Sequence, residues 1–565
     1  MLSGVATART IGRNPEYPRK FGYITMPDGV QLAYVAYLPR ATGRFPAVLQ
    51  YGPYQGGGST PAWPAGVWLK NGYAMVFASV RGTGCSQGVF HLFGRQEGPD
   101  GAAIVHWIGT QPWSDHRVGM IGASYPGFTQ ILVAAQHPRF LKAIAPSAIA
   151  SNTYSQIVYP GGIFNASFLA WWSLHAQPMG EAWGVRTRVG WGDRECEANY
   201  RAHPSSQLFL RAQAHPFFDQ WWNSRSLRKD IDRVDVPTFI SGTWQDNEIM
   251  GTGATDVYEH LQGPKRLSMS PGGHGWLFLQ PAFQEALVQW MNRWVKGDHN
   301  GIEARPPVTI YWEPYGGLPP GGGWATHYAS WPPQRTRPRT FWLTSRRTLS
   351  AKPPGDSPAD DRGLGYTFPS GVELTGNNAQ FAIAPNGYGS VTWTSAPFHR
   401  DFTILGSVQV RFYAASQNPD TDFEIALQDV YPDGDVRFLQ RGYLRASLRA
   451  VDPDRSTPDH LVHAYEQPRL LVPGRVYEFQ LSLPPLGAVL RRGQRLQLVM
   501  LAPSPIPQPN WGLVPLALPG QNTIYASARY PSEIVVPTIP GARARRPAPP
   551  CGSMPFQPCR KPTRH

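Results

Sequence analysis

The chain has 565 residues, of which 41% are hydrophobic and 12% aromatic, so it is too apolar for a disordered protein and too long for a single hydrophobic core. Its formal net charge is +14, but six of the basic residues lie in an acid-free C-terminal stretch and the others are scattered. That distribution offers no basic helix face for a nucleic acid, and we expect a globular protein of at least two domains with no nucleic-acid partner.

The N-terminus carries no sign of a targeting segment. Residues 1–20 form an N-terminal arm that lacks the apolar run of a signal peptide, and no stretch of the chain reaches 18 consecutive apolar residues. These features predict a cytoplasmic protein with no membrane partner.

Four cysteines are few for a chain of this length. Cys85 and Cys196 stand isolated in the sequence, which predicts neither a disulfide framework nor a zinc cluster. Cys551 and Cys559 lie close together in the C-terminal stretch, and the sequence leaves open whether they pair or remain free thiols.

Strands and helices alternate over the first 150 residues. Two alternating stretches, 21–26 and 31–38, flank Pro27-Asp28-Gly29, a turn signal typical of a hairpin. Further strands are predicted at 46–49, 73–80, 118–121 and 142–146, and helices at 63–71 and 101–109. This alternation indicates a mainly parallel, doubly wound sheet.

Residues 117–136 join a short apolar strand to a helix through Gly122-Ala123-Ser124-Tyr125-Pro126-Gly127. Because Ser124 lies where the strand turns sharply into the helix, the stretch matches the nucleophile elbow of α/β-hydrolases. Gly122 and Gly127 are expected there because side chains would collide with the neighbouring strand and helix. A second G-x-S-x-G motif contains Ser86, but no helical period follows it, and we interpret Ser86 as a loop residue.

The sheet pattern breaks between residues 151 and 234. This stretch combines irregular helical runs with six tryptophans, and we interpret it as a helical cap inserted into the sheet domain. Strands resume at 237–241 and 266–269, and a helix at 281–296 ends the domain. The predicted α/β-hydrolase domain therefore comprises residues 21–150 and 235–300.

Beyond residue 300 helical periodicity almost disappears. Alternating runs such as 308–312, 408–413 and 423–427 predict a β-sandwich over residues 301–540. Residues 541–565 are rich in proline and arginine, so we expect a disordered basic tail whose deletion leaves stability and turnover unchanged.

A nucleophilic serine needs a base within hydrogen-bond reach, and the base needs an acid that orients it. In α/β-hydrolases the acid and then the histidine follow the serine along the chain, each after a strand. Asp246 and His274 occupy these places, with Glu248 as the rival of Asp246. For the oxyanion we expect two donors, the backbone N–H of Tyr125 and the phenol of Tyr54.

Several motifs together resemble the CocE/NonD family, a peptidase S15-like group. They are G-x-S-Y-x-G at the elbow, Gly52-Pro53-Tyr54, residues 81–88, Gly242-Thr243-Trp244-Gln245-Asp246 and Gly273-His274, with 418–423 and 429–434 typical of the family's C-terminal jelly roll. The resemblance implies an α/β-hydrolase fold with a cap and a jelly-roll domain. It also implies a triad of Ser124, Asp246 and His274, an oxyanion tyrosine at Tyr54, and cleavage of esters or amides without a cofactor or metal.

The resemblance also suggests substrate contacts. In the α-amino-acid ester hydrolases of this family a carboxylate two residues after the catalytic aspartate helps to hold the substrate ammonium, and Glu248 matches that position. Ile249 is apolar, however, and residues 158–162 at the cap entrance contain no acid, which argues against aminoacyl specificity. Trp244, Trp171 and Trp172 are further candidates for contacts with an apolar substrate.

The favoured hypothesis is a serine hydrolase that forms an acyl-enzyme with a small ester or amide. X-Pro dipeptidyl peptidase, β-lactam acylase and α-amino-acid ester hydrolase activities stay open, as does a homodimer. A non-enzymatic alternative is a carbohydrate- or ligand-binding β-sandwich protein with a degenerate hydrolase domain. A metal-dependent hydrolase is disfavoured because no H-x-x-x-H or comparable ligand set is present.

Overall fold

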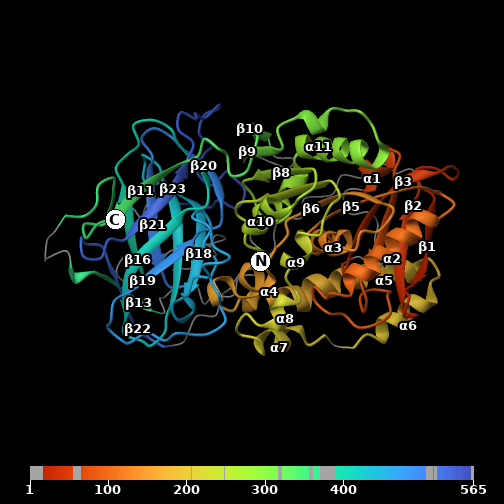
Figure 1. Cartoon of the computed structure of the whole chain (residues 1–565), viewed down its shortest axis with the longest axis horizontal. Coiled ribbons are helices and arrows are strands. Elements are labelled where there is room, and N and C mark those ends of the chain that lie inside the picture. The colour runs from red at the N-terminus through yellow and green to blue at the C-terminus, as the bar shows by residue number, and fades with distance from the viewer. Residues whose placement is uncertain are drawn as a thin grey trace.

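A computed structural model describes residues 17–54, 65–204, 206–246, 248–315, 321–355, 361–368, 389–503, 513 and 518–561. Figure 1 shows an α/β unit beside a β-rich unit, with helices on both faces of the sheet of the α/β unit. Of the predicted N-terminal arm, residues 1–16 lie outside the described range. Arg19 and Lys20 already belong to the first strand.

The α/β unit is built on one sheet of ten strands in the order β1-β2-β4-β3-β5-β6-β7-β8-β9-β10. Strands β3 to β9 run parallel to one another, and β1, β2 and β10 are added by antiparallel pairing at the two edges. The mainly parallel sheet that the sequence predicts is therefore confirmed. The strands are β1 (Arg19–Thr25), β2 (Gln31–Tyr37), β3 (Phe45–Gly52), β4 (Ala74–Ser79), β5 (Ser114–Ala123), β6 (Leu141–Ser147), β7 (Thr238–Thr243), β8 (Lys265–Ser270), β9 (Val308–Tyr315) and β10 (Gly321–Tyr328).

Apolar residues on both faces of the central strands explain why this sheet is buried between helices. Along β3, Val48 belongs to the core beneath α1 (Ala65–Lys70) and α11 (Pro281–Met291), whereas Leu49 belongs to the opposite core. That opposite core includes side chains of α2 (Glu97–Thr110), α3 (Tyr125–Ala134) and α10 (Thr252–His260). Successive strand residues point to opposite faces, so a continuous apolar run fills both cores.

The α/β unit extends further along the chain than the sequence suggests. The predicted boundary at residue 300 assigns the stretch 308–328 to the sandwich, but β9 pairs parallel with β8 and carries β10 with it. The β alternation of this stretch is real. Its partner strand β8, however, lies in the preceding domain. A local alternating pattern predicts a strand but not the strand with which it pairs.

The stretch between β6 and β7 is helical, as the cap hypothesis predicts. Its elements are η1 (Tyr154–Val158), η2 (Pro160–Gly162), α4 (Ala166–Trp171), η3 (Trp172–Ala176), α5 (Gln177–Gly190), α6 (Arg194–Arg201), α7 (Leu208–Gln213), α8 (Gln220–Asn223) and α9 (Arg228–Ile231). Helices α4, α7 and α8 lie below the sheet at the side that faces the β-rich unit (Figure 1). The cap therefore packs on the β-rich unit as well as on the α/β domain. At Gly161 a Cβ would lie only 2.2 Å from the carbonyl oxygen of Tyr443 in the β-rich unit.

The β-rich unit is a network of mostly antiparallel strands around an apolar interior. Its elements are β11 (Arg337–Leu343), β12 (Thr348–Ser350), β13 (Leu364–Phe368), β14 (Ser390–Ser395), β15 (Phe402–Gly406), β16 (Gln409–Ser416), β17 (Asp422–Val430), β18 (Val436–Arg445), η9 (Ala446–Leu448), β19 (Tyr477–Ser482), β20 (Leu486–Leu490), β21 (Arg495–Leu501), β22 (Gly520–Tyr525), β23 (Glu533–Thr538) and β24 (Cys559–Arg560). Along β16, Val410, Phe412 and Ala414 are buried and alternate with partly exposed residues, the period expected of a sandwich strand.

The C-terminal stretch packs on this unit. Strand β24 pairs antiparallel with β18, the side chains of Met554 and Gln557 are buried, and the backbone N–H of Phe438 donates to Pro558 O at 3.1 Å. The prediction of a disordered tail over residues 541–565 is therefore wrong for residues 541–561, and residues 562–565 lie outside the described range. This segment is held by individual apolar side chains and by pairing with the edge of β18. Such contacts produce no periodic pattern in the sequence from which an ordered segment could be predicted.

Two disulfides join all four cysteines. Cys85 is bonded to Cys196 of α6, with Cα atoms 4.4 Å apart, and Cys551 is bonded to Cys559. The prediction that the isolated Cys85 and Cys196 do not belong to a disulfide framework is wrong, because the fold brings together residues 111 positions apart in sequence. Disulfides are typical of oxidising environments, so the cytoplasmic location remains a prediction that these bonds disfavour. Among the described residues, no helix has the length and apolar character needed to cross a membrane.

Candidate active site

Ser124 occupies a sharp turn between β5 and α3. Its backbone has φ 63° and ψ −131°, a conformation that residues with a side chain rarely adopt. The turn is held on both sides, since Ser124 N–H donates to Ser147 O at 2.9 Å and Ser124 O accepts from the N–H groups of Gly127 and Phe128. The strand-turn-helix context predicted for the nucleophile elbow is present.

The two elbow glycines are required by close contacts. Gly122 has φ +150°, and a Cβ there would lie 2.5 Å from Cβ of Pro126. A Cβ on Gly127 would lie 2.6 Å from both Ser147 O and Cγ2 of Ile149. The expected collisions are thus confirmed, although at Gly122 the collision is with the first turn of α3.

Tyr54 follows β3, and its side chain reaches Ser124. Its hydroxyl lies 3.4 Å from Ser124 Oγ and accepts a hydrogen bond from Trp172 Nε1 at 3.0 Å. The backbone N–H of Tyr125 interacts with the same phenol. Burial raises the pKa of Tyr54 to about 12, so the phenol keeps its proton at neutral pH and can act as a donor. Both predicted oxyanion donors are therefore close to Ser124.

His274 and Asp246 form a tight pair on the loops after β8 and β7. His274 Nδ1 lies 3.0 Å from Oδ1 and 2.9 Å from Oδ2 of Asp246. Asp246 Oδ1 also accepts from the backbone N–H groups of Glu248 and Ile249, at 3.0 and 3.1 Å, which fixes the carboxylate. Asp246 therefore has the position of the orienting acid, and the Nε2 atom of His274 points to the other side of the ring.

Glu248, the rival acid, lies on that other side. Its Oε2 is 3.5 Å from His274 Nε2. Burial alone would lower the pKa of His274, but the carboxylates of Asp246 and Glu248 outweigh it and raise this pKa to about 9. Burial raises the pKa of Glu248, and the charge of Glu248 in turn raises that of Tyr54. Glu248 is thus close to both His274 and the phenol beside Ser124.

Ser124 lines a small pocket between the sheet domain and the cap. Its described lining is apolar except for the serine and two tyrosines, and it contains no charged side chain. The lining residues are Tyr54, Leu92, Phe93, Ser124, Tyr125, Phe128, Ala148, Ile149, Ala150, Ile157, Val158, Phe168, Leu169, Trp172 and Ile249. An apolar pocket of this kind suits an acyl chain or an aromatic ring.

The three candidate tryptophans have different places. Trp172 lines the pocket and stacks on Tyr125 with ring centroids 6.1 Å apart. Trp171 is the last residue of α4. It contacts the ring of Phe168 but does not itself line the pocket. Trp244 is 1% exposed and stacks on Trp331, so it serves the contact with the following domain instead of the pocket.

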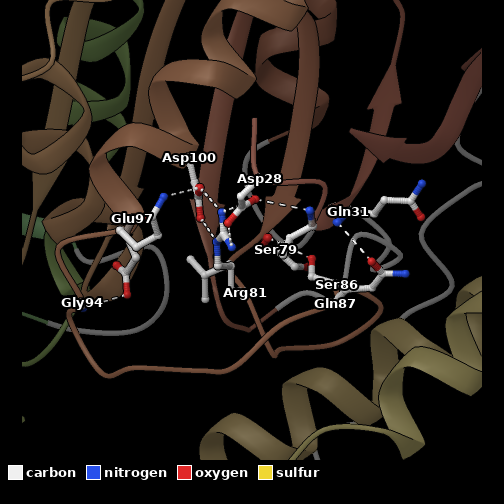
Figure 2. A network of polar contacts seen from close by, with 12 residues as sticks. Asp28, Gln31, Ser79, Arg81, Ser86, Gln87, Gly94, Glu97 and Asp100 are labelled. Carbon is white, nitrogen blue, oxygen red and sulfur yellow. Dashed lines mark hydrogen bonds and ion pairs between the residues drawn. The ribbon is translucent and has the colours of Figure 1, made fainter. Parts of the chain in front are cut away.

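Ser86 of the second G-x-S-x-G motif has a structural place. Its Oγ accepts from Ala33 N–H at 2.9 Å and donates to Ser79 O at 3.0 Å, and the residue is fully buried. Figure 2 shows this serine in a network that also holds Arg81 between Asp28 and Asp100. The interpretation of Ser86 as a loop residue agrees with these contacts.

The same network contains Glu97, which the sequence analysis did not single out. Its Oε1 accepts from Tyr125 Oη at 2.5 Å and from Gly94 N–H at 3.1 Å, the second of which is drawn in Figure 2. Burial raises the pKa of Glu97 to about 8. Glu97 therefore anchors the side chain of the residue whose backbone N–H is the expected oxyanion donor.

Gln245 is a second residue that the sequence analysis passed over. Its side-chain amide donates to Leu439 O at 2.8 Å, and its Oε1 accepts from Gly272 N–H at 3.2 Å. Gln245 thus ties the loop of Asp246 to strand β18 and to the loop of His274. Its position directly before Asp246 was the only signal in the sequence.

Metal ligation finds no support in the described part of the chain. The one group of three potential ligands there, Asp435, Cys551 and Cys559, has both of its sulfur atoms in a disulfide. A disulfide sulfur is not the thiolate that a metal ion requires.

The sheet, the elbow and the cap define a hydrolase of the α/β-hydrolase fold with a β-sandwich domain behind it. Two family models match the chain, the X-Pro dipeptidyl-peptidase (S15 family) over residues 28–276 and the X-Pro dipeptidyl-peptidase C-terminal non-catalytic domain over residues 300–535. The chain therefore carries a catalytic domain of the S15 family, followed by the C-terminal domain that accompanies it in X-Pro dipeptidyl-peptidases.

Relatives agree with this assignment along nearly the whole chain. A Rhodococcus protein named cocaine esterase is 26% identical over 91% of this chain and 97% of its own length. A Mycobacterium bovis protein whose name describes a serine esterase is also 26% identical, over 93% of this chain and 96% of its own. A solved CocE/NonD family hydrolase from Staphylococcus aureus, 19% identical, has a TM-score of 0.76 over 92% of this chain and 93% of its own, a likeness of fold.

Proposed function

We propose that this serine hydrolase cleaves small carboxylic esters with an apolar or aromatic acyl group through an acyl-enzyme on Ser124. One observation carries the proposal: a series of neighbouring polar groups connects Ser124 to His274. Ser124 Oγ lies 3.4 Å from Tyr54 Oη, the charge of Glu248 raises the pKa of Tyr54, and Glu248 Oε2 lies 3.5 Å from His274 Nε2. These contacts support a site in which the hydroxyl of Ser124, the phenol of Tyr54 and the imidazole of His274 act on one substrate.

In this mechanism Ser124 Oγ attacks the acyl carbonyl carbon while His274 Nε2 takes the serine proton. The carbonyl oxygen becomes negative, and Tyr54 Oη and the N–H of Tyr125 donate to it. Collapse of the tetrahedral intermediate expels the alcohol, which receives the proton from His274. Water then repeats the sequence on the acyl-enzyme and releases the acid.

The acyl preference follows from the lining of the pocket. Leu92, Phe128, Ile157 and Phe168 present hydrocarbon, and no described lining residue carries a charge that would balance a charged acyl group. The contact of Trp172 with Tyr54 adds an aromatic wall beside the nucleophile. An uncharged phenylacetyl group suits such a pocket better than an acyl group with a free ammonium.

Glu248 favours a second candidate, hydrolysis of α-amino-acid esters. Its carboxylate is largely buried, lies beside the reacting groups and could bind a substrate ammonium. The two candidate functions are distinguished by kcat/KM, measured for matched phenylacetyl and phenylglycyl esters and for an X-Pro anilide. A tenfold preference for the ammonium-bearing ester or for the X-Pro substrate would overturn the apolar-acyl proposal, and Glu248→Gln should then abolish that preference.

The nucleophile is tested with a p-nitrophenyl ester and a serine-reactive fluorophosphonate. Ser124→Ala should abolish turnover and labelling while Tm stays within a few degrees, because a serine at the elbow contributes little packing. Ser86→Ala is the control, since it should lower Tm through the lost bond to Ala33 but remain labelled. Labelling that persists in Ser124→Ala and vanishes in Ser86→Ala would refute the assignment.

A further inference from the structure

Residues 541–561 reach back from the β-rich unit to the loop of His274. The segment lies beyond residue 535, where the match to the family's C-terminal domain ends. It carries Phe556, whose ring meets the backbone next to the catalytic histidine proposed above. A Cβ placed on Gly273 would lie 2.5 Å from Cε2 and Cζ of Phe556, so the ring packs directly on the residue that precedes His274.

The ring of Phe556 also contacts the other side of the same loop. Its centroid is 6.2 Å from that of Trp276, with the planes at 73°. Thr243 Oγ1 donates to Gly273 O at 2.9 Å and holds the same residue. His274 therefore lies between two residues, Gly273 and Trp276, that both contact Phe556.

Several contacts fix the segment that carries Phe556. The Cys551–Cys559 disulfide closes it into a loop, and β24 pairs Cys559 with Arg437 of β18. Met554 Sδ accepts from Arg437 Nη1 at 3.6 Å, and the side chain of Met554 is buried. Phe556 itself has φ 56°, a backbone conformation that an L residue keeps only where its surroundings hold it.

We propose that Phe556 is a positioning residue for His274, and that the Cys551–Cys559 disulfide keeps it in place, so that an intact C-terminal loop is needed for full hydrolytic activity. This inference rests on the proposed role of His274. It reverses the expectation from the sequence that the tail can be deleted without effect.

The disulfide makes the arrangement sensitive to reductants. A dithiol delivers two electrons and two protons to the Cys551–Cys559 bond, which becomes two thiols while the dithiol becomes a cyclic disulfide. The sulfur-bearing residues of this bond are partly exposed, whereas Cys85 and Cys196 are fully buried. A mild dithiol should therefore open the C-terminal bond first.

The first test compares Phe556→Ala with Phe556→Leu. The alanine variant should lose about 10–100-fold in kcat for the p-nitrophenyl ester, because a displacement of about 1 Å at a catalytic group can cost that much. KM should change less than about threefold, since Phe556 is absent from the pocket lining. Leucine refills part of the volume and should restore most of kcat.

The second test approaches the same contact from Gly273. Gly273→Ala alone should lower kcat because the new methyl group pushes on the ring. The double variant Gly273→Ala with Phe556→Ala should be no worse than Phe556→Ala alone, since the methyl group then enters vacated space. Additive losses in the double variant would mean that the two residues do not act through their contact, and would overturn the proposal.

The disulfide has its own matched control. Cys551→Ser with Cys559→Ser should lower kcat as Phe556→Ala does and make it insensitive to dithiothreitol. Cys85→Ser with Cys196→Ser should keep the response to dithiothreitol. Wild-type kcat in both Phe556→Ala and the Cys551/Cys559 variant would refute the inference.

A readout without turnover separates this inference from the proposed function. In protein with ¹⁵N-labelled histidine, the ring signal that His274→Ala removes should shift in Phe556→Ala and in the reduced protein. If the shift occurs but no ester is hydrolysed, the positioning role stands and the proposed function fails. If esters are hydrolysed and the signal does not move, the positioning role fails alone. Thermal unfolding of each variant shows whether it is folded.

Discussion

Replacement of Glu248 by glutamine should make the enzyme faster near neutral pH, although it removes a carboxylate beside His274, the proposed catalytic base. His274 must be neutral to accept the serine proton, and the carboxylates beside it raise its pKa to about 9, which favours the imidazolium form at pH 7. Glu248 helps to cause this because its Oε2 lies 3.5 Å from Nε2 and favours the imidazolium form. Glutamine has the same shape without the charge.

The size of the effect follows from the geometry. Two unit charges at 3.5 Å attract by roughly 5 kcal/mol at an effective dielectric constant of about 20. Burial raises the pKa of Glu248, which opposes its ionisation and weakens its effect on His274. We therefore expect a fall of at least about one unit in the pKa of His274, or ~1.4 kcal/mol. The neutral fraction at pH 7, and kcat/KM with it, should rise about tenfold.

The assay is kcat/KM for an uncharged p-nitrophenyl ester between pH 5 and 10. The acid limb of the profile should move to lower pH in Glu248→Gln, and Glu285→Gln, which changes an exposed glutamate of α11, should leave the limb in place. An acid limb that stays where it is, or moves to higher pH, would refute the assignment of Glu248 as the group that raises the pKa of His274.

Three further changes probe the oxyanion side of the pocket. Tyr54→Phe should lower kcat by roughly 10²–10³ with a smaller change in KM, because the phenol stabilises negative charge that develops only in the transition state. A rise in KM with unchanged kcat would instead show that Tyr54 binds the substrate. Trp172→Phe removes the indole N–H that donates to Tyr54 and should lower kcat about fivefold, the equivalent of one neutral hydrogen bond, as steady-state kinetics would show. Burial raises the pKa of Glu97 from 4.5 to about 8, so its ionisation destabilises the fold as pH rises through that interval. The Tm of Glu97→Gln should therefore fall less than that of the wild type between pH 5 and 9. An unchanged pH dependence of Tm would show that ionisation of Glu97 does not cause the loss of stability.

Strong local patterns made much of the fold predictable. The apolar runs of β3, β4 and β5 are long enough to be buried on both faces, and the glycines around Ser124 mark the turn because no other residue fits it. The order of serine, acid and histidine along the chain then led to Asp246 and His274, and the structure brings these two within 3.0 Å. Each of these inferences needed only a short window of sequence and the rule that catalytic loops follow strands.

The parts that escaped prediction depend on partners far away in the chain. Strand β9 alternates like a sandwich strand, and only its pairing with β8 assigns it to the α/β sheet. Cys85 meets Cys196 because the cap folds back over the loop that contains Ser86. Glu97 is one of many glutamates until α2 places it beneath Tyr125.

The C-terminal loop shows why such contacts bear on function as well as on fold. Its composition, rich in proline and arginine, resembles that of a disordered tail, and the energy that orders it comes from a few specific contacts with β18. A composition rule averages over the segment and cannot register one phenylalanine that fits against one glycine. That glycine precedes His274, so the contact that the rule misses is also the one through which, in our proposal, the tail positions the base. The same reasoning makes Gly273 a constrained position for two reasons, the approach of Phe556 on one side and the geometry of the histidine loop on the other.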